Sequence, residues 1–109
     1  MEKEFIQLDD GMRMKNIENN SLFSVDYLEI EPGSIEENVY HDRLVEWLYI
    51  LEGELEFYLD KKIFSIKKGE SVFVDKYSVH GSVNKTSGIV KMLSVCSPPF
   101  EISDMKKCD

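Results

Sequence analysis

The chain has 109 residues, of which 42% are hydrophobic and 31% are charged. This length suits one domain with a core of its own, and the composition is typical of a globular protein rather than a disordered one. The 21 acidic and 13 basic residues give a net charge of −8, which repels phosphate backbones and anionic membranes. We therefore expect neither a nucleic acid nor a membrane as a partner.

The first twenty residues are polar and mixed, with turn signals at 9–11 and 18–20. They are charged where a signal peptide would be apolar, and no stretch of the chain approaches the ~18 apolar residues of a membrane span. The sequence therefore predicts a cytoplasmic protein in which a polar segment, 1–20, precedes the core.

From residue 22 onward, short apolar runs rich in Val, Ile, Phe and Tyr alternate with turns. The runs are 22–30, 46–51, 55–59, 63–66, 71–74 and 88–96. Many short strands at regular spacing, with no segment of helical period, predict an all-β antiparallel sandwich or barrel. We expect a single domain over 1–109, with its core at about 22–100 and a short charged tail at 101–109.

Strand parity predicts which side chains face inward, because alternate residues of a strand share a face. Glu46 shares its face with Leu48 and Ile50, whereas Trp47 should point outward. In the last run the inner face should carry Val90, Met92, Ser94 and Cys96. The mostly aliphatic interior with a few polar groups is typical of a small-ligand pocket, whose expected lining is Val39, Val72, Val74, Asn84 and Met92. Cys96 and Cys108 make no disulfide framework, so both should be free thiols.

Both histidines of the chain, together with Glu46, are candidate metal ligands. The short connection from His41 to Glu46 suits a hairpin, which places facing Cβ atoms ~5 Å apart, whereas His80 must come from another strand. Two imidazoles and a carboxylate are the donor set of a divalent transition metal such as Fe, Mn, Ni or Zn, and they leave positions open for other ligands. Taken singly, each residue also suits an ordinary role as a loop histidine, a strand-edge carboxylate or a hydrogen-bonded polar residue. A buried, unpaired glutamate is costly, however, and favours the metal.

The three candidate ligands lie in two glycine-bounded motifs. In the first, Gly33 is followed by five residues, Val39-Tyr40-His41, four residues, Glu46, six residues and Gly53. In the second, Gly69 is followed by five residues, Asp75-Lys76-Tyr77, two residues, His80, three residues and Asn84. With these motifs the chain resembles the cupins from about Leu22 to Phe100. The resemblance implies a double-stranded β-helix, or jelly-roll barrel.

The departures from the cupin motifs bear on function. In metal-binding cupins the position of Val39 is usually a histidine ligand, so the resemblance implies three ligands, His41, Glu46 and His80, rather than four. The metal is then expected to be weakly held or absent. Asp75 and Tyr77 replace a proline and a glycine, so that turn should differ in shape.

Three functions remain open at this point. The resemblance implies an enzyme that acts on a small polar metabolite, a sugar or small acid, by dioxygenase, isomerase or decarboxylase chemistry. Val39 favours the alternative, a non-catalytic module that binds a small ligand, and the third option is a structural or interaction domain with an empty barrel. Exposed edge strands and apolar outer faces, such as those expected at Trp47 and Phe57, predict a homodimer.

Overall fold

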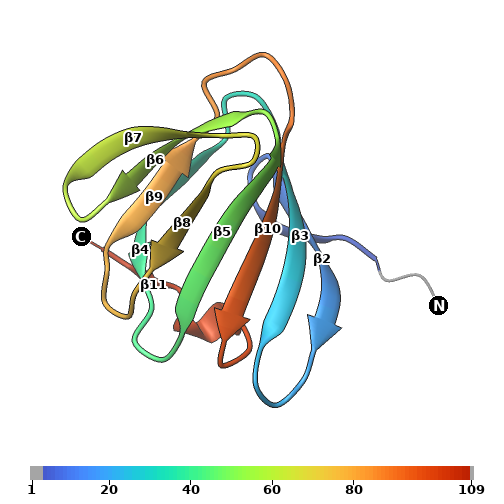
Figure 1. Ribbon diagram of the computed structural model, residues 1–109, viewed down its shortest axis with the longest axis vertical. Coiled ribbons are helices and arrows are strands. Elements are labelled where there is room, and N and C mark those ends of the chain that lie inside the picture. Colours follow the sequence, from blue (N-terminus) through green and yellow to red (C-terminus); the bar gives the residue numbers. More distant parts are fainter. Residues whose placement is uncertain (1–3, 109) are drawn as a thin grey trace.

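The computed structural model describes residues 4–108, which form two antiparallel sheets facing each other (Figure 1). The six-stranded sheet has the order β1 (Ile6–Asp9), β2 (Met12–Asn19), β3 (Ser24–Ile30), β10 (Val90–Ser97), β5 (Val45–Glu52) and β8 (Ser71–Val74). The five-stranded sheet has the order β11 (Lys106–Lys107), β4 (Ile35–Tyr40), β9 (His80–Val83), β6 (Glu54–Leu59) and β7 (Lys62–Lys67). A short 3-10 helix, η1 (Ile102–Asp104), precedes β11. The predicted all-β jelly-roll architecture is confirmed.

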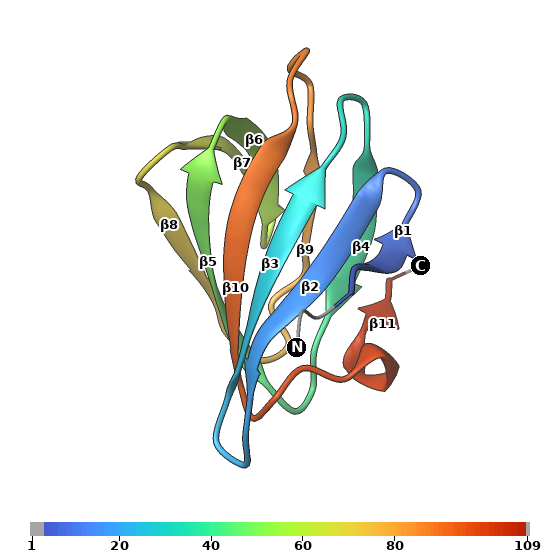
Figure 2. The same cartoon turned by 90° about the vertical axis from the view of Figure 1, so that its right-hand side faces the viewer.

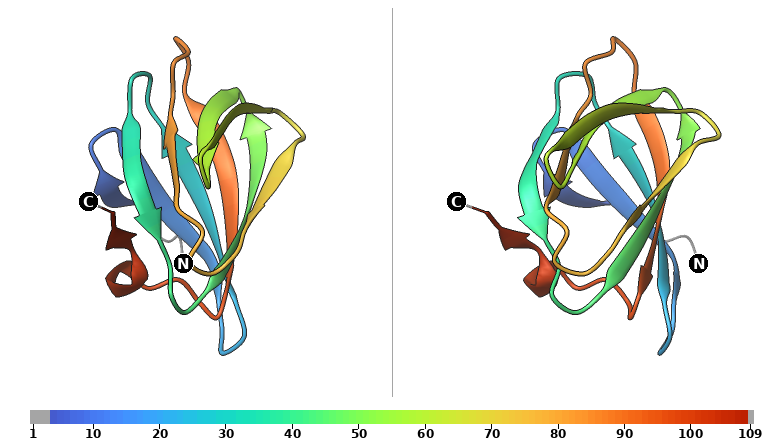
Figure 3. Two further views of the ribbon diagram at one scale, coloured as in Figure 1. Left: turned by 90° about the vertical axis from the view of Figure 1, so that its left-hand side faces the viewer. Right: turned by 60° about the vertical axis from the view of Figure 1, so that its left-hand side comes forward.

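The two sheets curve around the space between them. Figure 2 shows β8, β5, β10, β3 and β2 side by side in one layer, with β4, β6 and β9 behind it, and Figure 3 shows the same barrel from the other side. The chain passes from β5 to β6 through Gly53, whose φ of 90° favours glycine. A Cβ at Gly53 would lie 3.2 Å from Val90 Cγ2, so this motif glycine is also needed for close packing.

Period-2 alternation builds the core, as the sequence predicts. Strands β3 and β10 bury every second residue, and the predicted inner face of β10 is buried throughout. The main apolar cluster consists of Met12, Met14, Leu28, Ile30, Leu48, Ile50, Leu55, Phe57, Ile66, Val74, Val90 and Met92. Trp47 is 45% exposed, as expected on the outer face, but the outward placement of Phe57 is wrong, because β6 turns Leu55 and Phe57 together into the core.

The core begins earlier in the chain than the range 22–100 expected from the sequence. Segment 1–20 contains β1 and β2, and the side chains of Met12 and Met14 are buried. They alternate with Arg13, which forms an ion pair with Glu29 on the outer face of the neighbouring strand. The polar appearance of this segment thus reflects one solvent-facing side of an amphipathic strand.

Two further strands, β4 just before His41 and β11 in the tail, are not among the apolar runs predicted to be strands. β4 pairs with β9, and β11 in the tail pairs with β4. Cys96 and Cys108 are both free thiols, as expected. Within residues 4–108, no helix is long and apolar enough to cross a membrane.

Candidate metal centre

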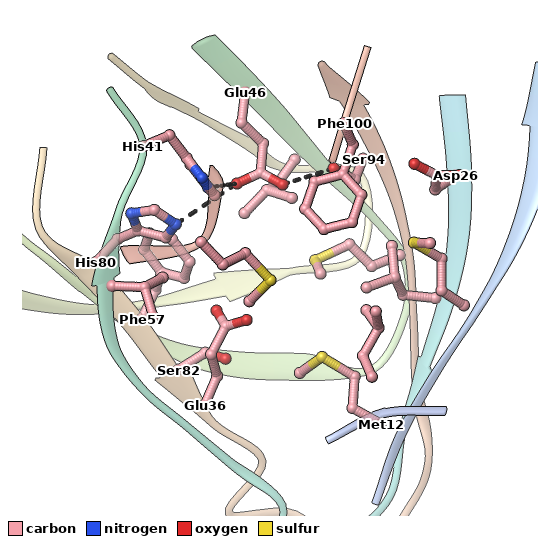
Figure 4. Close-up of a pocket in the computed structure, with 17 residues that line it drawn as sticks. Met12, Asp26, Glu36, His41, Glu46, Phe57, His80, Ser82, Ser94 and Phe100 are labelled. Atoms are coloured by element: carbon pink, nitrogen blue, oxygen red, sulfur yellow. Dashed lines mark hydrogen bonds and ion pairs between the residues drawn. The ribbon is translucent and has the colours of Figure 1, made fainter. Parts of the chain in front are cut away.

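The structure brings the three candidate ligands together between the two sheets (Figure 4). His41 follows the end of β4, Glu46 is the second residue of β5, and His80 begins β9. Glu46 Oε1 lies 3.6 Å from His41 Nε2 and 3.5 Å from His80 Nε2. The donor atoms of all three residues lie within 4.8 Å of one another, as ligands of one ion require.

Hydrogen bonds to carbonyl groups fix the tautomer of both imidazoles. His41 Nδ1 lies 2.8 Å from the Asp104 carbonyl oxygen, and His80 Nδ1 lies 3.0 Å from that of Ser78. A carbonyl only accepts, so each Nδ1 carries the proton and donates it. In the neutral rings the Nε2 lone pairs are therefore free and directed at the same carboxylate oxygen. Such support of a ligating imidazole is typical of metal sites in proteins.

The second oxygen of Glu46 is held from the neighbouring strand β10. Ser94 Oγ donates a hydrogen bond of 2.7 Å to Glu46 Oε2, and Cys96 Sγ lies 3.8 Å from the same oxygen. These contacts leave Oε1 to the imidazoles and fix the carboxylate plane. Burial, followed by the charge of Glu46, raises the pKa of Cys96 far above that of an ordinary thiol, so Cys96 is a neutral neighbour of the site.

The pKa values of His41, Glu46 and His80 indicate that these three groups share protons. Burial raises the pKa of Glu46, but the contacts with His41 and His80 outweigh it and hold that pKa well below its usual range. Burial lowers the pKa of each imidazole, whereas Glu46 raises it more, so both are raised overall. The charge of Glu36 adds to the increase at His80. A divalent cation can replace the protons that these groups share.

The loop that carries His41 is fixed from two distant segments. Asp104 Oδ1 accepts a hydrogen bond of 3.2 Å from the backbone N–H of Asp42, and the backbone N–H of Tyr77 donates one of 2.7 Å to the His41 carbonyl. Tyr77 adopts a φ of 65° in the turn where the cupin motif has glycine, and its side chain is exposed. The backbone hydrogen bond from Tyr77 to His41 thus still joins the second motif to the first despite the altered turn.

A cavity opens beside the cluster and continues between the sheets. Its lining consists of Leu8, Met12, Met14, Asp26, Leu28, Glu36, Val39, His41, Glu46, Leu48, Phe57, His80, Ser82, Met92, Ser94, Phe100 and Met105. Water-sized molecules can occupy about 40 Å³ of it, so a larger ligand must displace side chains. Four methionines in the wall make this feasible, because their unbranched chains change rotamer readily.

Two of the five residues expected to line the pocket do so, namely Val39 and Met92. Val39 is 3% exposed and pairs with His80 across β4 and β9. The structure places the other three elsewhere. Val72 and Val74 lie on β8, beyond β5 from the cavity, and pack in the apolar core. Asn84 is fully buried, but its amide donates to the Ile30 and Gly88 carbonyls, so it stabilises a turn.

Several polar residues of the cavity were not expected from the sequence. Asp26 follows from the parity of the run 22–30, which places Ser24, Asp26 and Leu28 on one face. Glu36 has no comparable signal, because a bulge between Glu36 and Val39 lets both line the cavity despite their odd spacing. The Asp104 carbonyl that orients His41 also lies far away in the sequence, in the tail.

Comparisons with known proteins agree with this architecture. The family model described as "Cupin domain" matches residues 26–96. KdgF from a Halomonas species superposes with a TM-score of 0.84 at 15% identity, over 90% of this chain and 88% of that one. A Streptomyces PAC13 variant with uridine superposes with a TM-score of 0.83 at 16% identity, over 99% of this chain and 86% of that one. A cupin-superfamily sugar phosphate isomerase from Silicibacter pomeroyi superposes with a TM-score of 0.73 at 23% identity, over 81% of this chain and 60% of that one. At these identities the likeness concerns the fold, and a comparison with curated protein sequences found no match.

Proposed function

The chain belongs to the cupin family, and on this premise we propose that it binds a divalent transition-metal ion through His41, Glu46 and His80 and acts as an enzyme on a small polar metabolite. The convergence of two Nε2 lone pairs on one oxygen of Glu46 carries this proposal. The donor set suits iron, manganese, nickel or zinc, and the carbonyl-bound Nδ1 atoms supply the outer support that such ions usually have.

The residues around the cluster would have different roles in a reaction on such a metabolite. When bound, the ion would polarise substrate oxygens as a Lewis acid. Ser94 holds Glu46 in place, and the carbonyls of Asp104 and Ser78 keep the imidazoles from rotating. The apolar wall, which includes Phe57, limits the number of water molecules beside the ion. Dioxygenase, isomerase and decarboxylase chemistry on a sugar or small acid are all compatible with such a site.

The similar structures support a small polar ligand. One is named a sugar phosphate isomerase, and another contains uridine. Sugars and uridine both carry hydroxyl groups, which can bond with the polar side chains that line the cavity.

Metal analysis of untagged protein tests the proposal, with Glu46→Gln as the site variant. Glu52→Gln is a matched control, because Glu52 lies on the same strand but is exposed and paired with Lys68. We expect close to one equivalent of metal in the native protein and in Glu52→Gln, and loss of most of it in Glu46→Gln. Equal metal content in the two variants, or none in native protein after anaerobic reconstitution, would contradict the proposal.

The second candidate function is a non-catalytic module that binds a small ligand. Val39 favours it, because a valine that lines the cavity beside His80 cannot supply the usual fourth ligand. A metal-free native protein that still bound small molecules in the cavity would establish this function instead. Turnover that depends on added metal and disappears in His80→Ala would exclude it.

We also propose that the protein forms a homodimer through the outer face of its six-stranded sheet. Residues that pair across neighbouring strands form two rows on this face. One row consists of Val25, Val95, Trp47 and Phe73, and the next consists of Tyr27, Leu93 and Tyr49. Trp47 and Phe73 are 45% and 54% exposed. An apolar face of this kind is typical of a contact surface between proteins. Sedimentation should show a dimer that Trp47→Glu dissociates, and a native mass of 12.7 kDa would contradict the proposal.

A further inference from the structure

The charge of the cavity restricts which metabolites it accepts. Among the described residues that line it there are three carboxylates, those of Asp26, Glu36 and Glu46, and neither lysine nor arginine. Sites for phosphates and carboxylates ordinarily contain such a cation or an array of backbone N–H groups. Apart from the metal and its two imidazole ligands, this cavity therefore offers an anionic ligand no cationic group.

Glu36 supplies a negative charge to the cavity in addition to that of the proposed metal ligand Glu46. It lies on β4 opposite Ser82 of β9, and Figure 4 shows both side chains across the cavity from Glu46. Glu36 is half-buried and also lines a hollow outside the cavity, together with Met105 and Lys107. Glu36 thus borders both the cavity and this outer hollow. Lys107 lines that outer hollow together with Glu36 and Glu37, and it does not line the cavity.

A bound metal ion does not reverse this charge. The carboxylates of Glu36 and Glu46 together balance the two positive charges of a divalent ion, and Asp26 adds a further acid group. An anion that reaches the metal must therefore enter a cavity without excess positive charge, where low dielectric strengthens repulsion. Hydroxyl groups, in contrast, can donate to Glu36 and bond with Ser82, and they also suit the metal.

We propose that the ligand of this cavity is an uncharged molecule bearing hydroxyl groups, and that Glu36 selects against its phosphorylated or carboxylated counterparts. This inference rests on the proposed metal-binding function and narrows its substrate class. A sugar or nucleoside without phosphate fits it, whereas a small acid or a sugar phosphate does not.

Spectroscopic titration of the cobalt(II)-loaded protein tests the selection without knowledge of the natural ligand. The probes are azide, a small anion, and imidazole, a small neutral ligand, each followed by the visible cobalt spectrum. The site variant is Glu36→Gln, and the control is Glu37→Gln, the adjacent residue, which does not line the cavity. We expect Glu36→Gln to bind azide about tenfold more tightly than native protein, since one repelling charge is removed. Imidazole affinity should be unchanged in both variants.

The outcomes separate the two proposals. Protein that takes up no cobalt overturns the proposed function and this inference together. Cobalt uptake with equal azide affinity in native protein, Glu36→Gln and Glu37→Gln overturns the inference alone. Saturation-transfer NMR on the loaded native protein then compares ribose with ribose 5-phosphate. Binding of ribose alone supports the inference, and binding of the phosphate ester, or of neither sugar, counts against it.

Discussion

Replacing Val39 with histidine should strengthen metal binding, because Val39 occupies the position of a missing ligand. Its side chain is buried, lines the cavity and stands opposite His80 in the β4–β9 pair. Facing side chains in such a pair have Cβ atoms ~5 Å apart, so an imidazole at 39 reaches the ion that His80 binds. In the metal-free protein the larger polar ring should destabilise the fold by about 1–3 kcal/mol.

The gain on metal binding is of similar size. Loss of a residue that merely supports a ligand typically weakens metal affinity by about 10–100-fold, and a direct ligand should contribute at least as much. At a fixed free-metal concentration, a 100-fold gain stabilises the folded protein by about 2.7 kcal/mol relative to native protein. Val39→His should therefore melt at a lower temperature than native protein without metal, and at an equal or higher one with metal.

Competition with a chromophoric chelator measures the affinity, and thermal unfolding followed by circular dichroism measures the stability. Val95→His is the control, because Val95 lies on the outer face of β10 and pairs with Trp47, away from the cluster. A folded Val39→His protein whose metal affinity equals that of native protein or of Val95→His would refute the placement of the ion beside residue 39.

Three further outcomes are expected. Ser94→Ala removes the 2.7 Å hydrogen bond to Glu46, so chelator competition should show metal affinity about tenfold weaker, and an unchanged affinity would show that Ser94 does not position the carboxylate. Because the pKa values of His41 and His80 are raised and a metal ion requires neutral imidazoles, lowering the pH should begin to weaken metal affinity while the pH is still above 6.5. In metal-free protein the same raised pKa values stabilise the fold at lower pH, and this stability is lost as the pH rises through them. Metal affinity and metal-free stability that change with pH in the same direction would contradict this account. Asn84→Ala removes four side-chain hydrogen bonds of a buried turn and should lower the free energy of unfolding by about 2–3 kcal/mol, measured by urea denaturation, with metal affinity unchanged.

The parts of the site that follow from local alternation were predictable from the sequence. The inward direction of Glu46 follows from its place two residues before Leu48, and that of Ser94 from the outward Lys91. The approach of His80 to the other ligands depended on the motif spacing, because strand parity alone does not say which strands meet.

The remaining parts depend on tertiary structure. The bulge in β4 changes the parity between Glu36 and Val39, so regular alternation misplaces one of them. β11 consists of Lys106 and Lys107, which carry no hydrophobic period, and it exists only because β4 offers an edge to pair with. Val72 and Val74 face inward as expected, but parity does not distinguish the packed end of a barrel from its open part.

The hydrogen bond from His41 to the Asp104 carbonyl spans 63 residues of chain. Two of the ligands, His41 and Glu46, are close in sequence, yet the segment that orients the first imidazole is synthesised long after both. A chain that has brought His41 near Glu46 but has not docked its tail lacks this hydrogen bond, so the imidazole is free to rotate and either nitrogen can carry the proton. The proposed metal binding therefore depends on the docked tail, and uptake of metal during refolding would report when the tail docks.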